Sequence, residues 1–513
     1  MRQTNTDSFT TEIPLRTAPA QEQALLARLE AARQVYNACL GESLKRLALL
    51  RQSKCYRAAL KIPEGKARSQ AFRKAQAAVG FREYDLHAYA VQFNHCWIGE
   101  HLDINTIQKL ATRAFNAAQQ HAFGQRGRPR FKGRHQMDSV EGKSNASGIR
   151  WREGHVEWLG LELEAIIGAD DLVIAHGLKS RVKYVRLVRR KLNGRHRFYA
   201  QLVCEGRPYQ KPQNRPGQGV VGLDIGPSTI AAVGEGEAFL EQFCADLAPR
   251  QDQIRRLQRR IDRQRRANNP DNYLPDGRIR PGPKVWRRSS RQRQTESQLA
   301  EAHRRMAAHR KTLHGQMTNR VLRMGNTIQL EKVSYRAFQR QYGKSVGVRA
   351  PGMFVQRLKR KAESADASVV EFPTRTTRLS QTCHGCGRIA PKPLAQRWHI
   401  CDCGIVAQRD LYSAFLASCV EGDRLNAGQA EMRWPGVDSL LQAALSRIQP
   451  ANGRPVPSSF GLNSRRQSRS PVKANVNAVE AQDVVPSIAP GNAGESLRET
   501  AESLEPPGFS RGE

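Results

Sequence analysis

The sequence predicts a mixed α/β protein, because segments with a two-residue apolar period and segments with a helical period both recur along it. Residues 145–210 alternate apolar and polar side chains, which is typical of half-buried strands. Residues 219–420 alternate short apolar runs with longer polar or amphipathic stretches, which predicts strands and helices in turn. We therefore expect a β-rich module whose helices are inserted earlier in the chain, followed by an α/β domain.

The beginning of the chain contains one short strand candidate and two helical stretches. Residues 11–20 could begin a strand, and residues 21–50 carry apolar side chains at spacings of three, four and seven, as one face of a helix requires. A second helical stretch covers about 66–124, where Asp103 and Asn105 are N-cap candidates for the last helix. The basic segment GQRGRPRFKGR at 125–135 then interrupts the pattern with Gly and Pro.

A hairpin and an arginine-rich helical pair dominate the middle of the chain. SRVKYVRLVRR and RHRFYAQLVCE are joined by LNG, which predicts two antiparallel strands. Residues 219–239 predict two further strands around a tight turn. Residues 247–324 hold 21 Lys and Arg against 6 Asp and Glu, and a Pro/Gly break at 269–283 divides them into two helices. A strand (TIQLEKV), a helix (FVQRLKRKAES), a strand (ASVVEFP), four cysteines and a last helix follow.

Length and charge limit the classes of function. A chain of 513 residues has room for roughly three domains, and 83 Lys and Arg against 47 Asp and Glu give a net charge of +36. Such an excess predicts a nucleic acid partner with salt-sensitive affinity. The alternative is an anionic membrane surface. We expect no membrane association, because no apolar run approaches the ~18 residues of a span and the N-terminus is polar.

The C-terminal tail and the cysteines give two further expectations. From about 451 the chain holds 7 Lys and Arg and 7 Asp and Glu and is rich in Ser, Pro, Gly and Asn, so we expect residues 435–513 to be mostly disordered. Six of the ten cysteines are scattered, mostly in apolar contexts, which favours a reducing, cytoplasmic compartment over a disulfide framework. They are Cys39, Cys55, Cys96, Cys204, Cys244 and Cys419.

Three carboxylates stand out as candidate metal ligands, each with an ordinary alternative. Asp224 ends the apolar run VVGL, where an ionised group needs a cation or hydrogen bonds, although it could also stabilise its own turn. Glu331 follows the strand candidate Ile328–Leu330 and could instead be a strand-edge Glu that pairs with Lys332 or an arginine. Asp410 precedes an apolar helical pattern and could be its N-cap. Converging carboxylates suit Mg²⁺ or Mn²⁺ in phosphodiester chemistry, so we expect Asp224, Glu331 and Asp410 to be catalytic.

The remaining four cysteines predict a zinc site. Cys383 and Cys386 form a C-x-x-C pair followed by Gly387, and Cys401 and Cys403 form a C-x-C pair followed by Gly404. Four thiolates are the usual tetrahedral ligand set of structural Zn²⁺. Because the second pair departs from C-x-x-C, His384 or His399 could replace one thiolate. Two turns with free thiols, or a redox dithiol, are the alternatives.

The order GLDIG, LEKVS and TCHGCG…CDCGIVAQRD resembles the RuvC-like nuclease domain of the transposon-encoded TnpB proteins, the relatives of type V CRISPR effectors. The resemblance is specific over about 219–420 and looser in EQALLARLEAARQVYNACL and GRPRFKGR. It implies that the RuvC aspartates fall on Asp224 and Asp410 and the glutamate on Glu331. The zinc-ribbon ligands would fall on Cys383, Cys386 and Cys403, with Cys401 one position later than the family's cysteine, which would be at Ile400.

The resemblance also implies a domain organisation. Residues 1–20 and 125–215 would form a β-barrel-like wedge module, and 21–124 its helical recognition insertion. Residues 216–382 and 404–434 would form the RuvC-like (RNase H-like) domain, with 247–324 as a helical hairpin and 383–403 as an inserted zinc ribbon. The family often has D-R-D-x-N-A-A at its last aspartate, whereas this chain has Q-R-D-L-Y-S-A. Gln408 and Tyr412 therefore replace polar partners of Asp410.

The activity implied is RNA-guided cleavage of double-stranded DNA by a two-metal site that uses Mg²⁺ or Mn²⁺. The partners would be a guide RNA made from the transposon end and a DNA target, in a prokaryotic, nucleoid-associated setting. Proteins of this kind were long described as transposases acting in DNA recombination. Three alternatives remain: a compact type V CRISPR effector, an RNA-guided DNA-binding protein with weak nuclease activity, and a transposase that joins strands.

Overall fold

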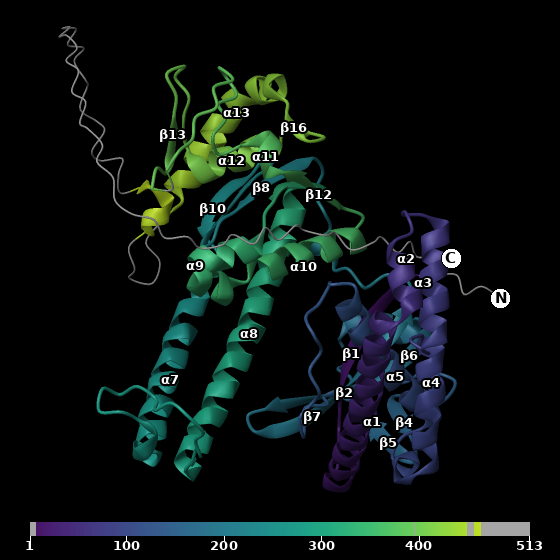
Figure 1. The fold of residues 1–513 in the computed structure, drawn as a ribbon. Coiled ribbons are helices and arrows are strands. Elements are labelled where there is room, and N and C mark those ends of the chain that lie inside the picture. Colours follow the sequence, from purple (N-terminus) through teal and green to yellow (C-terminus); the bar gives the residue numbers. More distant parts are fainter. Residues whose placement is uncertain (1–6, 394, 449–455, 463–513) are drawn as a thin grey trace, which may run out of the picture. The chain divides into compact units, whose positions relative to one another are not determined.

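The computed structural model describes residues 7–393, 395–448 and 456–462. Two compact units make up this structure: the first ends at Tyr209 and the second begins at Gln210. Each unit combines helices with β-sheets, which confirms the predicted mixed α/β class (Figure 1). Within the described ranges, no helix has both the length and the apolar character that crossing a bilayer would need.

The first unit contains two antiparallel sheets. The larger has the strand order β1-β7-β6-β2, and the smaller has the order β3-β4-β5. A bridge between Leu15 and Ala165 joins them at one edge. The strands are β1 (Ser8–Leu15), β2 (Ser139–Glu141), β3 (Arg150–Arg152), β4 (His155–Trp158), β5 (Leu161–Glu164), β6 (Val182–Leu192) and β7 (Arg195–Glu205).

The β6–β7 hairpin forms where the sequence predicts it. Its two turn residues, Asn193 and Gly194, have φ angles of 49° and 80°. Asn and Gly adopt this left-handed conformation most readily, and it matches the twist of the flanking strands. The LNG signal therefore correctly predicted the hairpin.

Helices fill the chain between β1 and β2. Asp103 caps the last of them, since its Oδ1 accepts a hydrogen bond from the Thr106 N–H at 3.1 Å, while Asn105 lies inside the helix. Asp103 is thus the correct one of the two predicted caps. The helices of the first unit are α1 (Pro19–Gln52), α2 (Lys54–Leu60), α3 (Lys66–Ala78), α4 (Glu83–Val91), α5 (Ile104–Ala122) and α6 (Leu172–Lys179), with 3-10 turns η1 (Gln92–His95) and η2 (Trp97–Glu100).

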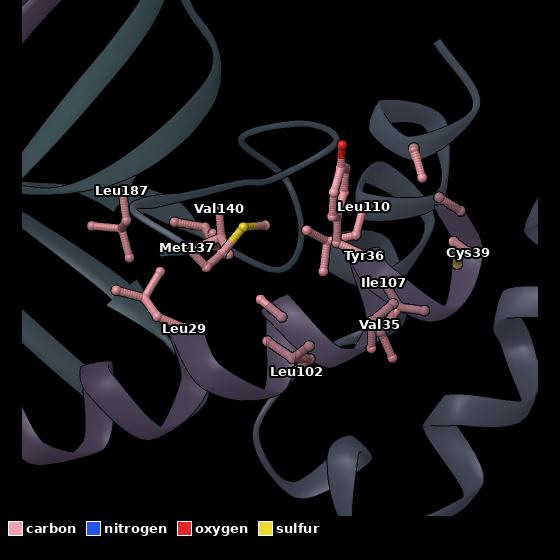
Figure 2. Packing of buried hydrophobic residues seen from close by; sticks show 14 of the residues in the cluster. Leu29, Val35, Tyr36, Cys39, Leu102, Ile107, Leu110, Met137, Val140 and Leu187 are labelled. Carbon is pink, nitrogen blue, oxygen red and sulfur yellow. The ribbon is translucent and has the colours of Figure 1, made fainter. Parts of the chain in front are cut away.

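One hydrophobic cluster joins these helices to the larger sheet. In Figure 2, Leu29 of α1 faces Val140 of β2, Leu187 of β6 and Met137, which lies just before β2. Ile107 of α5 is also buried in the cluster. Burying one such side chain contributes about 1.5–3 kcal/mol, so the cluster accounts for much of this unit's stability.

The second unit is built on a five-stranded mixed sheet with the order β10-β9-β8-β11-β12. The first three strands form an antiparallel meander, and β11 and β12 run parallel to β8. The strand β10 was not predicted from the sequence. The strands are β8 (Val220–Ile225), β9 (Thr229–Val233), β10 (Ala238–Gln242), β11 (Thr327–Lys332) and β12 (Ser368–Pro373).

Helices cover both faces of this sheet. Along β9, Ala231 and Val233 belong to a cluster with residues of α12, whereas Ile230 and Ala232 belong to a cluster with residues of α8 and α10. Alternate residues of a strand face opposite sides, so the sheet is buried twice. This burial explains why the strands read as nearly continuous apolar runs.

The other elements of the second unit include a long helical hairpin. Helices α7 and α8 pack side by side and extend away from the sheet (Figure 1). The helices are α7 (Ala248–Asn268), α8 (Ser290–Met324), α9 (Tyr335–Arg349), α10 (Pro351–Ser364), α11 (Thr374–Thr377), α12 (Arg409–Ala417) and α13 (Ala427–Ser446). Two small hairpins, β13 (Trp398–Ile400) with β14 (Val406–Gln408) and β15 (Val420–Glu421) with β16 (Arg424–Leu425), and the 3-10 turns η3 (Pro212–Asn214), η4 (Ala245–Leu247), η5 (Pro270–Asn272) and η6 (Ser458–Phe460) complete it.

The predicted start of the tail at residue 435 is wrong. Helix α13 continues through Pro435 to Ser446, because Val437, Leu441 and Leu445 recur every four residues and are buried. Phe460 is buried in the same cluster. The rest of the disorder prediction falls on 449–455 and 463–513, which lie outside the described residues.

Candidate functional site

Two parallel strands place the first two candidate carboxylates next to each other. Leu223 of β8 is the register partner of Leu330 of β11, so the following residues, Asp224 and Glu331, are neighbours across the strands. Side chains at corresponding positions of paired strands point to the same face. Asp410 reaches this place from the first turn of α12, which packs on β8 and β9.

One cavity of about 460 Å³ is lined by all three carboxylates. The fold therefore brings together residues that are far apart in the sequence. The arrangement is open, because among the described residues only the four cysteines form a compact group of metal-ligating atoms. The cavity is also lined by side chains that could bind substrate, notably Lys392, Arg397, Arg409, Ser413 and Tyr342.

The cavity holds its carboxylates in a strained electrostatic state. Burial raises the pKa of Asp224 well above its usual value, and the negative charges of Asp410 and Glu331 raise it further. The positive charges of Arg409 and Arg397 lower the pKa of Asp224, but they oppose this rise only in part. Asp224 keeps some exposed surface toward the cavity, but protein atoms surround it. Like charges held close in a largely buried site are relieved by a cation, so this donor set fits a hard divalent metal.

Glu331 is held by two donors at the cavity wall. Burial raises its pKa, and hydrogen bonds from the Leu379 N–H and the Thr377 hydroxyl, the latter at 3.4 Å, oppose the rise. The alternative that Glu331 pairs with Lys332 or an arginine is wrong, since Glu331 makes no ion pair in the described structure and Lys332 is exposed. Successive residues of a strand point to opposite faces, which keeps these two side chains apart.

Asp410 is not the N-cap of its helix. Gln408 occupies that position, and its Oε1 accepts a hydrogen bond from the Leu411 N–H at 2.8 Å. Asp410 is thereby left to face the cavity, where its Oδ2 accepts a hydrogen bond from the Thr229 hydroxyl at 3.3 Å. Its Oδ1 lies 3.6 Å from Arg409 Nε. The longer Gln side chain, placed two residues earlier, thus replaces Asp410 in the capping role.

Tyr412 is not a polar partner of Asp410. Its side chain faces the cysteine segment instead. Its buried hydroxyl accepts a hydrogen bond from the His384 N–H at 3.1 Å and donates one to His384 Nδ1 at 2.7 Å. The substitution of Gln408 and Tyr412 in the family pattern therefore alters two different contacts, the helix cap and the support of the cysteines.

The four cysteines lie in two tight turns. Their Sγ atoms are all within 4.8 Å of one another, with Cys383 and Cys403 at 3.5 Å and Cys386 and Cys401 at 3.4 Å. Four sulfurs at the ~2.3 Å Zn–S distance of a tetrahedral site would be about 3.8 Å apart, so the set fits Zn²⁺. The turns close through glycines in the left-handed conformation, Gly387 and Gly404.

Neither histidine replaces a thiolate. His384 is bonded to Tyr412, and His399 Nδ1 lies 2.6 Å from Lys392 Nζ. Cys401 belongs to the cluster although it comes one position later than in the family pattern. Ile400, at the family's position, is 63% exposed. The β13–β14 turn begins at Cys401, whose N–H donates to Ile405 O at 3.0 Å, and this turn directs the later residue inward.

Three cationic residues of the cavity were missed from the sequence. Arg409 directly precedes Asp410, while Lys392 and Arg397 lie in the spacer between the cysteine pairs. Lys392 Nζ is fixed by Ser380 O at 3.1 Å and by His399. The chain is so rich in Lys and Arg that no local pattern distinguishes these three, and only the fold places them opposite the carboxylates.

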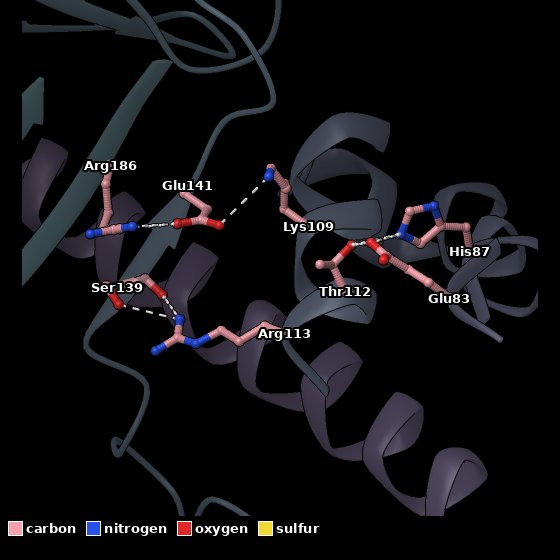
Figure 3. Close-up of polar contacts among 8 residues, drawn as sticks. All are labelled: Glu83, His87, Lys109, Thr112, Arg113, Ser139, Glu141 and Arg186. Carbon is pink, nitrogen blue, oxygen red and sulfur yellow. Dashed lines mark hydrogen bonds and ion pairs between the residues drawn. The ribbon is translucent and has the colours of Figure 1, made fainter. Parts of the chain in front are cut away.

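The first unit contains a separate polar cavity of about 650 Å³. In Figure 3 its wall is formed by internal pairs: Arg186 contacts Glu141 at 2.9 Å, and Arg113 donates to Ser139 O at 3.0 Å. Lys109 lies 3.9 Å from the other side of Glu141. None of the predicted site residues lines this cavity.

Comparison with known families agrees with one part of this site. Residues 352–416 match the family model described as Cas12f1-like, TNB domain. The match covers α10, β12, the four cysteines and Asp410. The resemblance to TnpB proteins and their type V relatives is thereby confirmed over this segment. No curated protein matches the chain.

Three solved structures are similar at 10% sequence identity. A Cas12f1 protein in a complex with sgRNA and target DNA has a TM-score of 0.41 and covers 81% of this chain and 99% of its own. A CRISPR-Cas12f ternary complex has a TM-score of 0.27, with 78% and 82% covered. The mini-RNA-guided endonuclease CRISPR-Cas_phi3 has a TM-score of 0.30, with 83% and 92% covered.

Proposed function

We propose that this protein is an RNA-guided, Mg²⁺-dependent DNA endonuclease of the TnpB type, encoded by an insertion sequence. The observation that carries the proposal is the convergence of Asp224, Glu331 and Asp410 on one cavity. The matched segment that contains Asp410 and the cysteines supports the same assignment. Within this proposal, residues 383–403 are a zinc ribbon inserted into a RuvC-like domain.

The roles of the residues follow from their charge and position. Asp224, Glu331 and Asp410 would hold Mg²⁺ or Mn²⁺, which when bound supplies Lewis-acid stabilisation of the reacting phosphate. Lys392 and Arg397 line the same cavity and would hold the phosphate oxygens. Thr229 and Thr377 donate hydrogen bonds that fix the orientation of Asp410 and Glu331.

The partners follow from charge. The excess of +36 suits a protein that binds a guide RNA and double-stranded DNA mainly through phosphates. Helices α7 and α8 together carry 15 arginines and would form one wall of the nucleic-acid channel. In such complexes base pairing with the guide supplies the sequence specificity, and the protein contacts the backbone.

A compact type V CRISPR effector is the second candidate. The description of the matching family model, Cas12f1-like, favours it. The two candidates share their chemistry and differ in the RNA. Sequencing the RNA that copurifies with the protein separates them, because a transposon-end RNA supports the first and a repeat-derived RNA supports the second.

Cleavage of a plasmid that carries the guide-matched target tests the proposal. The RNA-loaded protein should cut in Mg²⁺ and not in EDTA. Asp224→Ala should lower the rate by about three orders of magnitude or more, which corresponds to several kcal/mol of transition-state stabilisation. Asp423→Ala is the matched control, since Asp423 is exposed and outside the cavity.

Three outcomes would contradict the proposal in different ways. Equal rates for wild type and Asp224→Ala would remove the carboxylates from the mechanism. Guide-dependent binding without cleavage would indicate an RNA-guided DNA-binding protein. Joined transposon ends instead of broken plasmid would indicate a strand-transferring transposase.

A further inference from the structure

We propose that the tip of the α7–α8 hairpin, residues 269–289, binds an unpaired base of a single-stranded nucleic acid against Trp286. This goes beyond the proposed function, which requires only backbone contacts from the hairpin. The tip lies outside the carboxylate cavity, so its binding can be measured without cleavage.

The tip is an ordered structure. Asn269 is buried and joins its two ends: its Oδ1 accepts a hydrogen bond from the Arg287 N–H at 2.6 Å, and its Nδ2 donates to Arg265 O and Arg287 O, each at 2.9 Å. Asn272 Nδ2 donates to Val285 O at 2.8 Å. A preformed loop loses little conformational freedom on binding, which favours a recognition role.

Trp286 is presented as a supported but accessible ring. The guanidinium of Arg265 lies 5.4 Å from the ring centroid, and Asp262 holds that guanidinium with a 3.0 Å ion pair. Tyr273 makes an edge contact with Trp286 at 5.9 Å between centroids. Trp286 nevertheless remains 39% exposed, and Val285 beside it is 80% exposed. Packing inside the hairpin therefore fixes the indole without covering it.

The charge around the ring suits phosphates. Arg280, Lys284 and Arg287 belong to the tip, and none of them makes an ion pair with a carboxylate in the described part of the chain. Arg280 and Lys284 donate hydrogen bonds to the Tyr273 and Gly282 carbonyls of the tip, which leaves their positive charge without an anionic partner. An accessible aromatic ring with unpaired positive charge in the same loop is the combination that binds single strands, because the ring stacks on a base while the cations contact the backbone. A duplex keeps its bases stacked on each other and offers the ring no partner. A protein surface would not require cations that lack a carboxylate partner.

Fluorescence anisotropy on the full-length protein in EDTA tests the proposal. The probes are a 20-nucleotide oligouridylate RNA, a 20-nucleotide oligothymidylate DNA and a 20-base-pair DNA duplex. Trp286→Ala should weaken single-strand binding about fivefold or more, as expected for the loss of one stacked base. Trp286→Phe should retain most of the affinity, and duplex binding should stay within about twofold.

Two further measurements guard against a merely unfolded tip. Trp97→Ala is the matched control, because Trp97 is 49% exposed in the first unit, against His101. In the wild type, an RNA with one 5-iodouridine should crosslink to the peptide that contains Trp286. Loss confined to the RNA probe would identify RNA as the ligand, and loss with both single strands would identify any unpaired base.

The proposal is overturned by any of three results. Trp286→Ala could bind all probes like wild type, or it could weaken the duplex as much as the single strands. It could also change the oligomeric state and leave nucleic-acid binding intact, which would make the tip a protein interface. None of these results bears on cleavage by the carboxylate cavity, so the two proposals can fail separately.

Discussion

The two candidate metal sites of the second unit are built in opposite ways. The cysteine cluster draws all four ligands from residues 383–403, and its sulfurs already lie within 4.8 Å of one another. The carboxylate site draws its ligands from β8, β11 and α12, and they line a cavity without closing on one point. The first site is local and assembled, whereas the second depends on the whole sheet and holds like charges.

This difference has an energetic consequence. A metal in the cysteine cluster would hold two turns together and contribute directly to folding. A metal in the cavity would instead relieve repulsion among buried carboxylates. Removing ligands should therefore destabilise the protein at the first site and stabilise it at the second.

The largest effect is expected at the cysteine cluster. Cys386→Ser changes an exposed side chain and should affect little besides the metal. We expect bound zinc, measured by mass spectrometry, to fall from about one per chain to none, and the free energy of unfolding to drop by about 3 kcal/mol or more. Cys55→Ser, also exposed, should change neither. Full zinc retention in Cys386→Ser would show that the cluster is not the zinc site.

Acid should weaken the sheet that assembles the carboxylate site. Burial lowers the pKa of His314 to about 4, and its Nε2–H donates to Arg349 O at 2.8 Å. In the unfolded chain the His314 imidazole has a pKa near 6.5. The stability that neutral His314 contributes to the folded state is therefore complete above that pH and is lost as pH falls toward 4. The loss should be about 2 kcal/mol at pH 5. Urea unfolding of His314→Gln should lack this part of the pH dependence, whereas the exposed control His95→Gln should keep it.

Tyr412→Phe tests the link between the cysteine segment and α12. The substitution leaves the buried His384 N–H and Nδ1 without their partner, which should cost about 1.5 kcal/mol. Thermal unfolding should show the loss, and Tyr84→Phe, which is exposed, should not. An unchanged melting temperature would show that the hydrogen bonds between Tyr412 of α12 and the cysteine segment do not contribute to stability.

The smallest effect should have the opposite sign. Because burial and like charges raise the pKa of Asp224, removing its charge in Asp224→Asn should raise the free energy of unfolding in EDTA by about 1 kcal/mol. The gain is small because Asp224 keeps some exposed surface, and solvent screens its charge. Mg²⁺ should reduce the gain, since it stabilises only the wild type. Destabilisation in EDTA would show that the carboxylates are satisfied without a metal.

The sequence predicted the elements whose signals are local. The apolar run before Asp224, the LNG turn and the Cys-Gly turns all have compact signatures, and the structure contains each of them. It missed β10, which follows β9 after a short turn and lacks an alternating pattern. It also missed α9, whose sequence is largely polar.

The candidate site was predicted only in part, because only some of its residues have a local signal in the sequence. The three carboxylates were found because each interrupts an expected pattern, but their surroundings were not. The Gln408 cap depends on a side-chain reach that no propensity encodes, and Lys392 approaches the cavity only through the fold. The roles of Asp224, Glu331 and Asp410 as metal ligands stay a prediction.

Helix α12 contributes one residue to the carboxylate cavity and another to the support of the cysteine segment. Asp410 and Tyr412 are two positions apart, which separates their directions by about 200° around a helix of 3.6 residues per turn. One faces the carboxylate cavity and the other faces the cysteine turns. A single-residue insertion between them would rotate one side by about 100° relative to the other. The spacing of these two residues is therefore as constrained as their identity, and homologues with a gap here would have to rebuild one of the two sites.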